Sequence, residues 1–151
     1  MKSSHMFAFV WLLLAACVAS AQPDFTAELM VAAGHGETDE VKSLLDRGAN
    51  VNARDSLGFT ALMFAAKSGS TSTVKLLLAK GADANVRSKI LGYTALINAA
   101  AFGDEKMVEA LIAQGANVNA RNDDGVTALT FAEQAGKLGN VQVLKAHGGT
   151  K

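Results

Sequence analysis

Cysteine, proline and aromatic residues are scarce in this sequence of 151 residues, which has one Cys, one Pro and 6% aromatics. The single thiol, Cys17, excludes a disulfide within the chain and a cysteine zinc cluster. Neither sign of charge is in excess, because 14 basic side chains offset 14 acidic ones. This balance disfavours a polybasic nucleic-acid binder and an acidic disordered tail. Half of the residues are hydrophobic, with much Ala and Leu, which favours one domain of closely packed helices.

The longest apolar run lies near the N-terminus, where residues 6–19 carry no charge and Lys2 precedes them. The run is shorter than the roughly 20 residues of a membrane-spanning helix, and Ala19-Ser20-Ala21 follows it. A basic start, a short apolar centre and an Ala-x-Ala site are typical of a secretory signal peptide. We therefore predict that residues 1–21 are cleaved and that the mature domain, residues 22–151, is periplasmic or secreted.

Cys17 leaves an alternative open. Leu14-Ala15-Ala16-Cys17 resembles a bacterial lipobox, in which the Cys becomes the lipidated first residue of the mature protein. We expect cleavage after Ala21 because the Ala-x-Ala site is well formed. Membrane association would follow only from lipidation of Cys17. A mature domain without a thiol suits an oxidising compartment.

The rest of the chain repeats itself every 33 or 34 residues. Thr60-Ala61-Leu62 recurs as Thr94-Ala95-Leu96 and as Thr127-Ala128-Leu129, and the same register reaches back to Leu29. Glycines, valines and leucines also align in all four copies: Gly36, Gly69, Gly103 and Gly136; Val41, Val74, Val108 and Val141; Leu44, Leu77, Leu111 and Leu144. Agreement at this many positions indicates a repeat protein.

Each copy predicts a helix, a turn, a second helix and a loop. Thr60 can cap the first helix with its hydroxyl, and Gly69 permits the left-handed conformation that ends it. Val74 and Leu77 belong to the apolar stripe of the second helix. Helices of about nine residues are too short to be stable alone in water, so they must stack on neighbouring copies.

These residues resemble the ankyrin repeat, whose pattern is Thr-Pro-Leu-His-x-Ala with a 33-residue period. The resemblance implies an all-α solenoid of about four helix-turn-helix repeats with short β-hairpin-like loops. The expected repeats are about residues 24–57, 58–91, 92–124 and 125–151. The family's Pro is Ala in the three full motifs here, and its His is Met63, Ile97 or Thr130.

The end copies differ from the middle ones, as a finite stack requires, because terminal repeats need a polar outer face. In the last copy, Glu133 stands where the others have Ala, and Lys145 where they have Leu or Ile. The first copy lacks the Thr, and Asp24 is expected to cap its helix.

Reactive side chains do not converge on a catalytic or metal site in the sequence after residue 21. His35 and His147 each precede a helix-ending Gly and are expected at the surface. No Ser/His/Asp order, His-Glu-x-x-His motif or glycine-rich phosphate loop occurs. Residues 122–125 lack the spaced carboxylates and closing Glu of a calcium loop and predict a turn. We therefore expect no catalysis, cofactor, metal or small-molecule substrate.

The resemblance implies a protein-interaction scaffold that uses its loop tips and the concave face of its first helices. The middle loop is one residue longer, and its Ile90 and Leu91 either contact a partner or fold back onto the neighbouring loop. Phe102 is either a concave-face hot spot or packs against the next repeat. The candidate partner-binding residues are Arg54, Leu57, Phe59, Arg87, Lys89, Ile90, Leu91, Tyr93, Phe102, Arg121 and Asp123.

Three of these candidates, Arg54, Arg87 and Arg121, each fall two residues after a loop Asn. Because stacked helices lie about 8–10 Å apart, the three guanidiniums should form a column along one edge. The column could pair with carboxylates of a partner. A solvated face or a local pair with Asp55 is the alternative that we favour.

The sequence thus predicts a non-catalytic protein that binds another protein, of unknown identity, and no nucleic acid. Its resemblance to ankyrin proteins with signal peptides in Gram-negative bacteria implies a periplasmic accessory factor linked to oxidative-stress defence. The alternative is an inhibitor or immunity protein that covers the active site of a periplasmic enzyme or toxin, with the arginine column facing an acidic partner.

Overall fold

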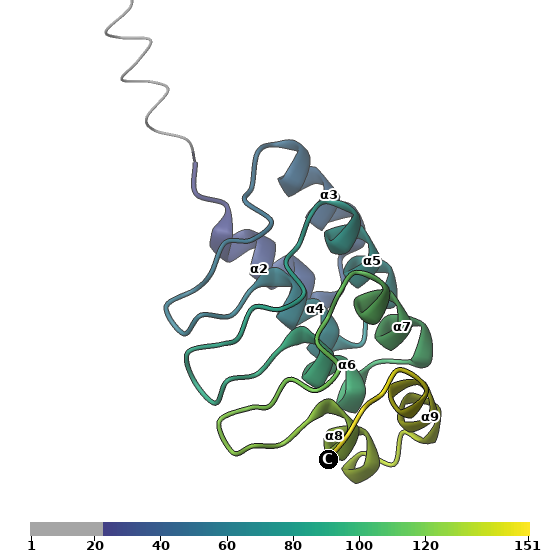
Figure 1. Cartoon of the computed structure of the whole chain (residues 1–151). Coiled ribbons are helices and arrows are strands. Elements are labelled where there is room, and N and C mark those ends of the chain that lie inside the picture. Colours follow the sequence, from purple (N-terminus) through teal and green to yellow (C-terminus); the bar gives the residue numbers. More distant parts are fainter. Residues whose placement is uncertain (1–22) are drawn as a thin grey trace, which may run out of the picture.

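The computed structural model describes residues 23–151, whose eight helices form four consecutive pairs (Figure 1). The first helices of the pairs are α2 (Thr26–His35), α4 (Ala61–Ser68), α6 (Ala95–Phe102) and α8 (Ala128–Gln134). The second helices are α3 (Thr38–Asp46), α5 (Thr71–Ala79), α7 (Glu105–Ala113) and α9 (Leu138–Ala146). The predicted all-α repeat solenoid is confirmed. The predicted signal peptide and Cys17 lie outside the described residues.

The helices stack in two rows. In the inner row α2, α4, α6 and α8 contact one another in series, and α3, α5, α7 and α9 do so in the outer row (Figure 1). The aligned leucines Leu44, Leu77, Leu111 and Leu144 are all buried between the rows. Burial of a leucine side chain contributes about 1.5–3 kcal/mol, so each short helix is stabilised by its neighbours. No helix of residues 23–151 has the length and apolarity to cross a bilayer.

Threonine caps begin two of the inner helices as predicted. Thr60 accepts a hydrogen bond from the Met63 amide and Thr94 one from the Ile97 amide. Thr127 differs, because its hydroxyl donates to the Thr150 carbonyl (2.7 Å) instead.

The predicted cap at Asp24 is wrong by one residue, since the N-cap of α2 is Phe25. The Asp24 carboxylate still accepts a hydrogen bond from the Thr26 amide (2.9 Å). It therefore holds the entry to the helix from one position further out.

The end of α6 departs from the repeat pattern. Gly69 ends α4 in the left-handed conformation with φ 75°, but the aligned Gly103 is extended, with φ −86°. Glycine is needed at 103 for space instead, because a Cβ there would lie 2.6 Å from Met107 Sδ and 2.8 Å from the Ala99 carbonyl oxygen. The expectation that every aligned glycine ends its helix in the same way is therefore wrong at Gly103.

Carbonyls at the C-terminal end of α6 and at Gly103 bind a side chain of the next repeat, although the Ala99 carbonyl also accepts from the Gly103 amide (2.8 Å). Asn140 of α9 is buried, and its Nδ2 lies 3.4 Å from the Ala99, 3.1 Å from the Ala100 and 3.2 Å from the Gly103 carbonyl oxygens. The asparagine thus replaces the missing left-handed turn as the C-terminal cap of α6. Nothing in the repeat pattern assigned it this role.

Three loops project from the helix stack, and we call them fingers (Figure 1): residues 54–59, 87–93 and 121–126. Backbone hydrogen bonds close each one, from Asp55 N to Phe59 O, Ser88 N to Tyr93 O, and Asn122 N to Val126 O. The predicted hairpin-like shape is confirmed, although the only β-bridge in residues 23–151 joins Arg121 and Thr127.

Asparagines link the repeats at the bases of the fingers. Asn52 donates from Nδ2 to the Gly81 carbonyl (3.1 Å) and accepts at Oδ1 from the Asp83 amide (2.7 Å). Two further rungs repeat this geometry, Asn85 with Gly115 and Asn117, and Asn119 with Gly148 and Thr150. We call Asn52, Asn85 and Asn119 the asparagine ladder. It joins consecutive repeats in a chain that lacks the family's motif histidine.

The last repeat has the polar outer side chains that a terminal repeat requires. Glu133 pairs with Lys145 (3.8 Å) and with Lys151 (2.9 Å). The expectation for Glu133 and Lys145 is confirmed.

Candidate binding groove

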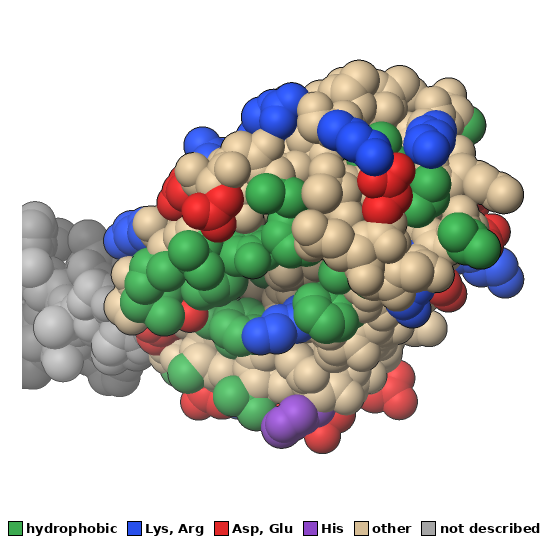
Figure 2. Space-filling model, turned by 90° about the horizontal axis from the view of Figure 1, so that it is seen from below, with side chains coloured by type: hydrophobic (Ala, Val, Ile, Leu, Met, Phe, Trp, Pro, Cys, Tyr) green, Lys and Arg blue, Asp and Glu red, His purple; other side chains and the backbone are tan. Residues whose placement is uncertain are grey.

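A hollow of about 460 Å³ opens between the fingers and the inner helices α4, α6 and α8. Figure 2 shows hydrophobic side chains gathered around a hollow on this face, with a basic side chain among them. We call this hollow the groove. Its apolar lining is Leu57, Phe59, Met63, Phe64, Leu91, Tyr93, Ile97, Ala101, Phe102 and Phe131, and its polar lining is Asp55, Lys67 and Asn98.

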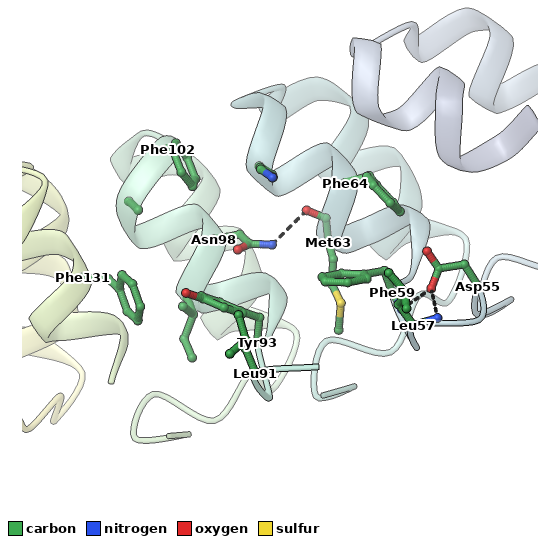
Figure 3. Close-up of a pocket in the computed structure, with 13 residues that line it drawn as sticks. Asp55, Leu57, Phe59, Met63, Phe64, Leu91, Tyr93, Asn98, Phe102 and Phe131 are labelled. Atoms are coloured by element: carbon green, nitrogen blue, oxygen red, sulfur yellow. Dashed lines mark hydrogen bonds between the residues drawn. The ribbon is translucent and has the colours of Figure 1, made fainter. Parts of the chain in front are cut away.

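Aromatic pairs join the fingers to the helices on the groove's surface (Figure 3). The ring centroids of Phe59 and Phe64 lie 5.8 Å apart, and those of Tyr93 and Phe131 lie 5.7 Å apart. Tilted pairs at this distance contribute about 0.5–1.5 kcal/mol beyond their buried area. They fix the fingers over the helices, so the groove is formed before any partner arrives.

The polar groups of the groove differ in how many of their hydrogen-bonding atoms already have a partner. The Asp55 carboxylate already accepts hydrogen bonds from the Leu57 amide (3.0 Å) and the Phe59 amide (2.8 Å). Asn98 donates from Nδ2 to the Met63 carbonyl (3.2 Å; Figure 3), and its Oδ1 accepts no hydrogen bond from a described residue. Lys67 is exposed and forms none of the ion pairs of residues 23–151. Within residues 23–151, the groove therefore presents the ammonium of Lys67, the Oδ1 of Asn98 and the Oδ2 of Asp55 without a hydrogen-bond or ion-pair partner.

Leu91 holds a strained position at the tip of the middle finger. It has φ 64°, and no other residue in the described part of the chain except glycine has a positive φ. The left-handed conformation costs a residue with a Cβ roughly 1–2 kcal/mol. Leu91 is nevertheless 49% exposed, so the strain holds an apolar side chain at the mouth of the groove without burying it.

The three arginines form the predicted column, but their guanidinium groups already bind acceptors within the protein. Arg54 donates to the carbonyls of Gly58 (3.3 Å) and Arg87 (2.6 Å), so it reaches the next finger. Arg87 pairs with Asp123 (3.1 Å). Of the two favoured alternatives, the local pair of Arg54 with Asp55 is wrong, because it is not among the ion pairs of the described residues. The solvated face agrees with the exposure of Arg54, Arg87 and Arg121.

The last arginine of the column behaves in the same way. Arg121 donates to the Gly125 carbonyl and to the Lys151 carbonyl, each at 2.6 Å. Arg54 and Arg87 thus join neighbouring fingers, whereas Arg121 joins its own finger to Lys151. These carbonyl and carboxylate acceptors explain why a column of like charges is tolerated along one edge.

The structure brings five of the eleven candidate residues to the groove: Leu57, Phe59, Leu91, Tyr93 and Phe102. Phe102 and Ile90 are 54% and 48% exposed, which contradicts burial by neighbouring loops or repeats. Ile90 and Lys89 belong to the exposed finger but do not line the groove. The remaining candidates, Arg54, Arg87, Arg121 and Asp123, lie along the finger edge.

Of the helix side of the groove, the sequence alone indicated Phe102 and missed the rest. Phe64, Asn98 and Phe131 occupy the same position of successive repeats, two residues after the aligned leucine of the inner helix, and Val31 is their counterpart in α2. Three of the four are large apolar residues at a position that faces the fingers. That regularity was available in the aligned repeats.

The two histidines and the turn over residues 122–125 lie where the sequence predicts them. His35 ends α2 and His147 follows α9, both exposed as expected. Asn122 Oδ1 accepts hydrogen bonds from the Asp124 amide (3.1 Å) and the Val126 amide (2.8 Å), so the predicted turn over residues 122–125 is confirmed. Residues 23–151 contain no cluster of three His, Cys, Asp or Glu side chains that could hold a metal.

Paired short helices, projecting fingers and a concave groove agree with a comparison against known families. The family described as ankyrin repeats (3 copies) matches residues 3–88 and residues 72–151. The chain belongs to the ankyrin-repeat family. Ankyrin repeats mediate binding to other proteins and are generally non-catalytic, so this ankyrin-repeat protein is a protein-interaction module. Comparison with curated proteins gave no match.

Proposed function

We propose that this ankyrin-repeat protein binds its partner protein in the groove and catalyses no reaction. The observation that carries the proposal is the exposure of large apolar side chains around one hollow. Leu57, Leu91 and Phe102 are 44%, 49% and 54% exposed and all three line the groove. Apolar side chains gathered at a preformed concavity are typical of interaction sites.

Partner capture from an extract of the exported proteins of the host tests the groove. We expect Leu91→Asp and Phe102→Asp to lose the partner, because each places a charge on the apolar surface. The control is Ser72→Asp, which adds the same charge to an exposed site on the outer-row helix α5. Retention of the same partners by both groove variants would overturn the proposal.

We further propose that the protein acts outside the cytoplasm after cleavage between Ala21 and Gln22. The support is the basic start, the short apolar run and the Ala-x-Ala site of residues 1–21. Mass spectrometry of the protein isolated from its host should find Gln22 at the N-terminus. A lipidated Cys17 would overturn this assignment and place the domain on a membrane.

An accessory role in oxidative-stress defence is the biological function that we propose. It is supported by resemblance to exported ankyrin proteins of Gram-negative bacteria. A strain lacking the gene should survive peroxide less well, and wild-type protein but not Phe102→Asp should restore survival. Equal survival with and without the gene would refute the role. The inhibitor or immunity alternative relied on a free arginine column, and the hydrogen bonds of Arg54 to the Arg87 carbonyl and of Arg121 to the Lys151 carbonyl remove its main support.

A further inference from the structure

The groove has a charge and hydrogen-bonding pattern that restricts what it can hold. Among the described residues that line the groove, Lys67 is the one cation and Asp55 the one acid. The Leu57 and Phe59 amides both donate to Asp55 Oδ1 and hold that carboxylate against its own finger, whereas Lys67 forms none of the ion pairs of residues 23–151. A ligand that buried the apolar surface and carried no negative charge would leave the ammonium partly desolvated and unpaired. A ligand with a carboxylate at this point would instead form a charge-assisted hydrogen bond.

The floor of the groove provides a group suited to a peptide backbone. Asn98 is only 7% exposed, and its Nδ2 is fixed by the Met63 carbonyl. Its Oδ1 accepts no hydrogen bond from a described residue and is not sealed from solvent, so a donor group of a bound ligand can reach it. An amide N–H of an extended segment is the donor that fits between the fingers and α6, since an extended backbone presents N–H groups along its edge.

The apolar contacts lie on both sides of that amide. Leu57 and Leu91 come from the finger tips, whereas Phe64, Phe102 and Phe131 come from the helices. The apolar finger-tip series ends at the third finger, where Asp124 takes the position of Leu57 and Leu91. The apolar lining is therefore limited to the first two fingers and the helices α4, α6 and α8, with Lys67 on α4.

From these observations we propose that the partner inserts an extended apolar segment carrying one Asp or Glu, whose carboxylate pairs with Lys67 and whose backbone amide donates to Asn98. This inference rests on the proposed protein-binding function of the groove. The strained Leu91 supports it, because strain retained at an exposed apolar side chain is expected where that side chain makes a contact.

Selection from a displayed library of random peptides identifies the probe. Purified wild-type protein should select sequences in which one acidic residue is flanked by aliphatic or aromatic residues. Two synthetic forms of the best sequence, one with the acid and one with the corresponding amide, are then titrated. The acid form should bind wild-type protein about three- to fivefold more tightly, the upper part of the range for an exposed ion pair.

Protein variants locate the charge. Lys67→Met should abolish the difference between the two peptides, and Lys67→Arg should restore it. Lys75→Met is the matched control, because Lys75 is an exposed lysine on the outer-row helix α5, and it should leave the difference unchanged. N-methylation of one backbone amide of the peptide should weaken binding at least fivefold if Asn98 accepts from it.

The other outcomes separate this inference from the proposed function. If wild-type protein binds both peptides equally, or if Lys67→Met and Lys75→Met weaken binding of the acid form equally, the proposal of an acidic partner segment is overturned. Loss of partner capture by Phe102→Asp would still support the groove as the binding site in that case. If dodecanoate displaces a labelled peptide at a lower concentration than the unlabelled peptide does, the proposal of a peptide ligand is overturned in favour of a small amphipathic anion. Selected peptides that bind Phe102→Asp as well as wild type would refute both.

Discussion

Replacing Asn140 tests whether one buried side chain stabilises the junction between the third and fourth repeats. Its exposed fraction is 3%, and its Nδ2 approaches three carbonyl oxygens of α6 and Gly103 at 3.1–3.4 Å. Two N–H groups can satisfy two carbonyls at a time, and a buried unsatisfied group costs about 1–3 kcal/mol. Alanine recovers about 0.5 kcal/mol of helix propensity. Loss of two such bonds, less the gain in helix propensity, should lower the free energy of unfolding of Asn140→Ala by about 1.5–5.5 kcal/mol.

Asn140→Asp sharpens the test because it keeps the shape and reverses the hydrogen bonding. A carboxylate has no donor for the carbonyls, and it places a negative charge at the negative end of α6. It should therefore be more destabilising than alanine at neutral pH. Urea denaturation followed by circular dichroism measures both variants, with Gln142→Ala on the exposed face of α9 as control. A loss below about 0.5 kcal/mol for alanine, or equal losses for aspartate and alanine, would refute the capping role.

Three further perturbations test the caps, the ladder and the fingers. Asp104 caps α7; partial burial raises its pKa, but hydrogen bonds from the Met107 amide and the Thr71 hydroxyl outweigh this and leave the pKa below its usual 3.8. The stabilisation from the charged carboxylate is therefore complete above that value and is lost as the pH falls through the folded-state pKa. Asparagine still caps a helix but does not titrate, so Asp104→Asn should lose less stability than wild type between about pH 5 and pH 2. Identical acid-unfolding profiles of the two proteins would count against this role of Asp104. Asn85→Ala removes hydrogen bonds of 2.8 and 2.7 Å and should cost about 1–2 kcal/mol in urea denaturation, whereas an unchanged midpoint would show that water replaces the rung. Gly92 has φ 63°, and a Cβ there would lie 2.5 Å from both Arg87 Nη2 and Asp123 Oδ1. Gly92→Ala should therefore lower the free energy of unfolding by about 1–2 kcal/mol. An unchanged thermal unfolding temperature would contradict this backbone strain.

The repeated elements of the fold were predictable, because each rests on a residue type that recurs at one spacing. Thr60 and Gly69 fixed the ends of a helix by local chemistry, and the aligned leucines predicted its buried face. The junction at Gly103 was not predictable in this way. Its conformation depends on Asn140, a side chain from another repeat, and no local pattern connects the two.

The residues of the groove can likewise be divided into those that a local sequence pattern predicts and those that depend on a distant contact. Leu57, Leu91 and Phe102 could be found because apolar residues at expected loop tips or helix ends are unusual in themselves. The arginines misled, since a charged residue in a loop indicates exposure but not which carbonyl lies within reach of its guanidinium. Asn98 was hidden among residues that read as core, and its free oxygen depends on a hydrogen bond to Met63 of the preceding repeat.

The asparagine ladder and the Asn140 cap have opposite consequences for how this array can be rearranged. Every rung of the ladder uses the same atoms, so by that criterion any repeat could follow any other and copies could be inserted or exchanged. Asn140 is placed against a preceding helix that ends at an extended glycine, Gly103, whose carbonyl it binds. Exchanging the third repeat for a copy of the second would bring a left-handed Gly69-type end against it. The order of the last two repeats is thus specified by a single pair of residues, and a shuffled or duplicated array would have to carry both.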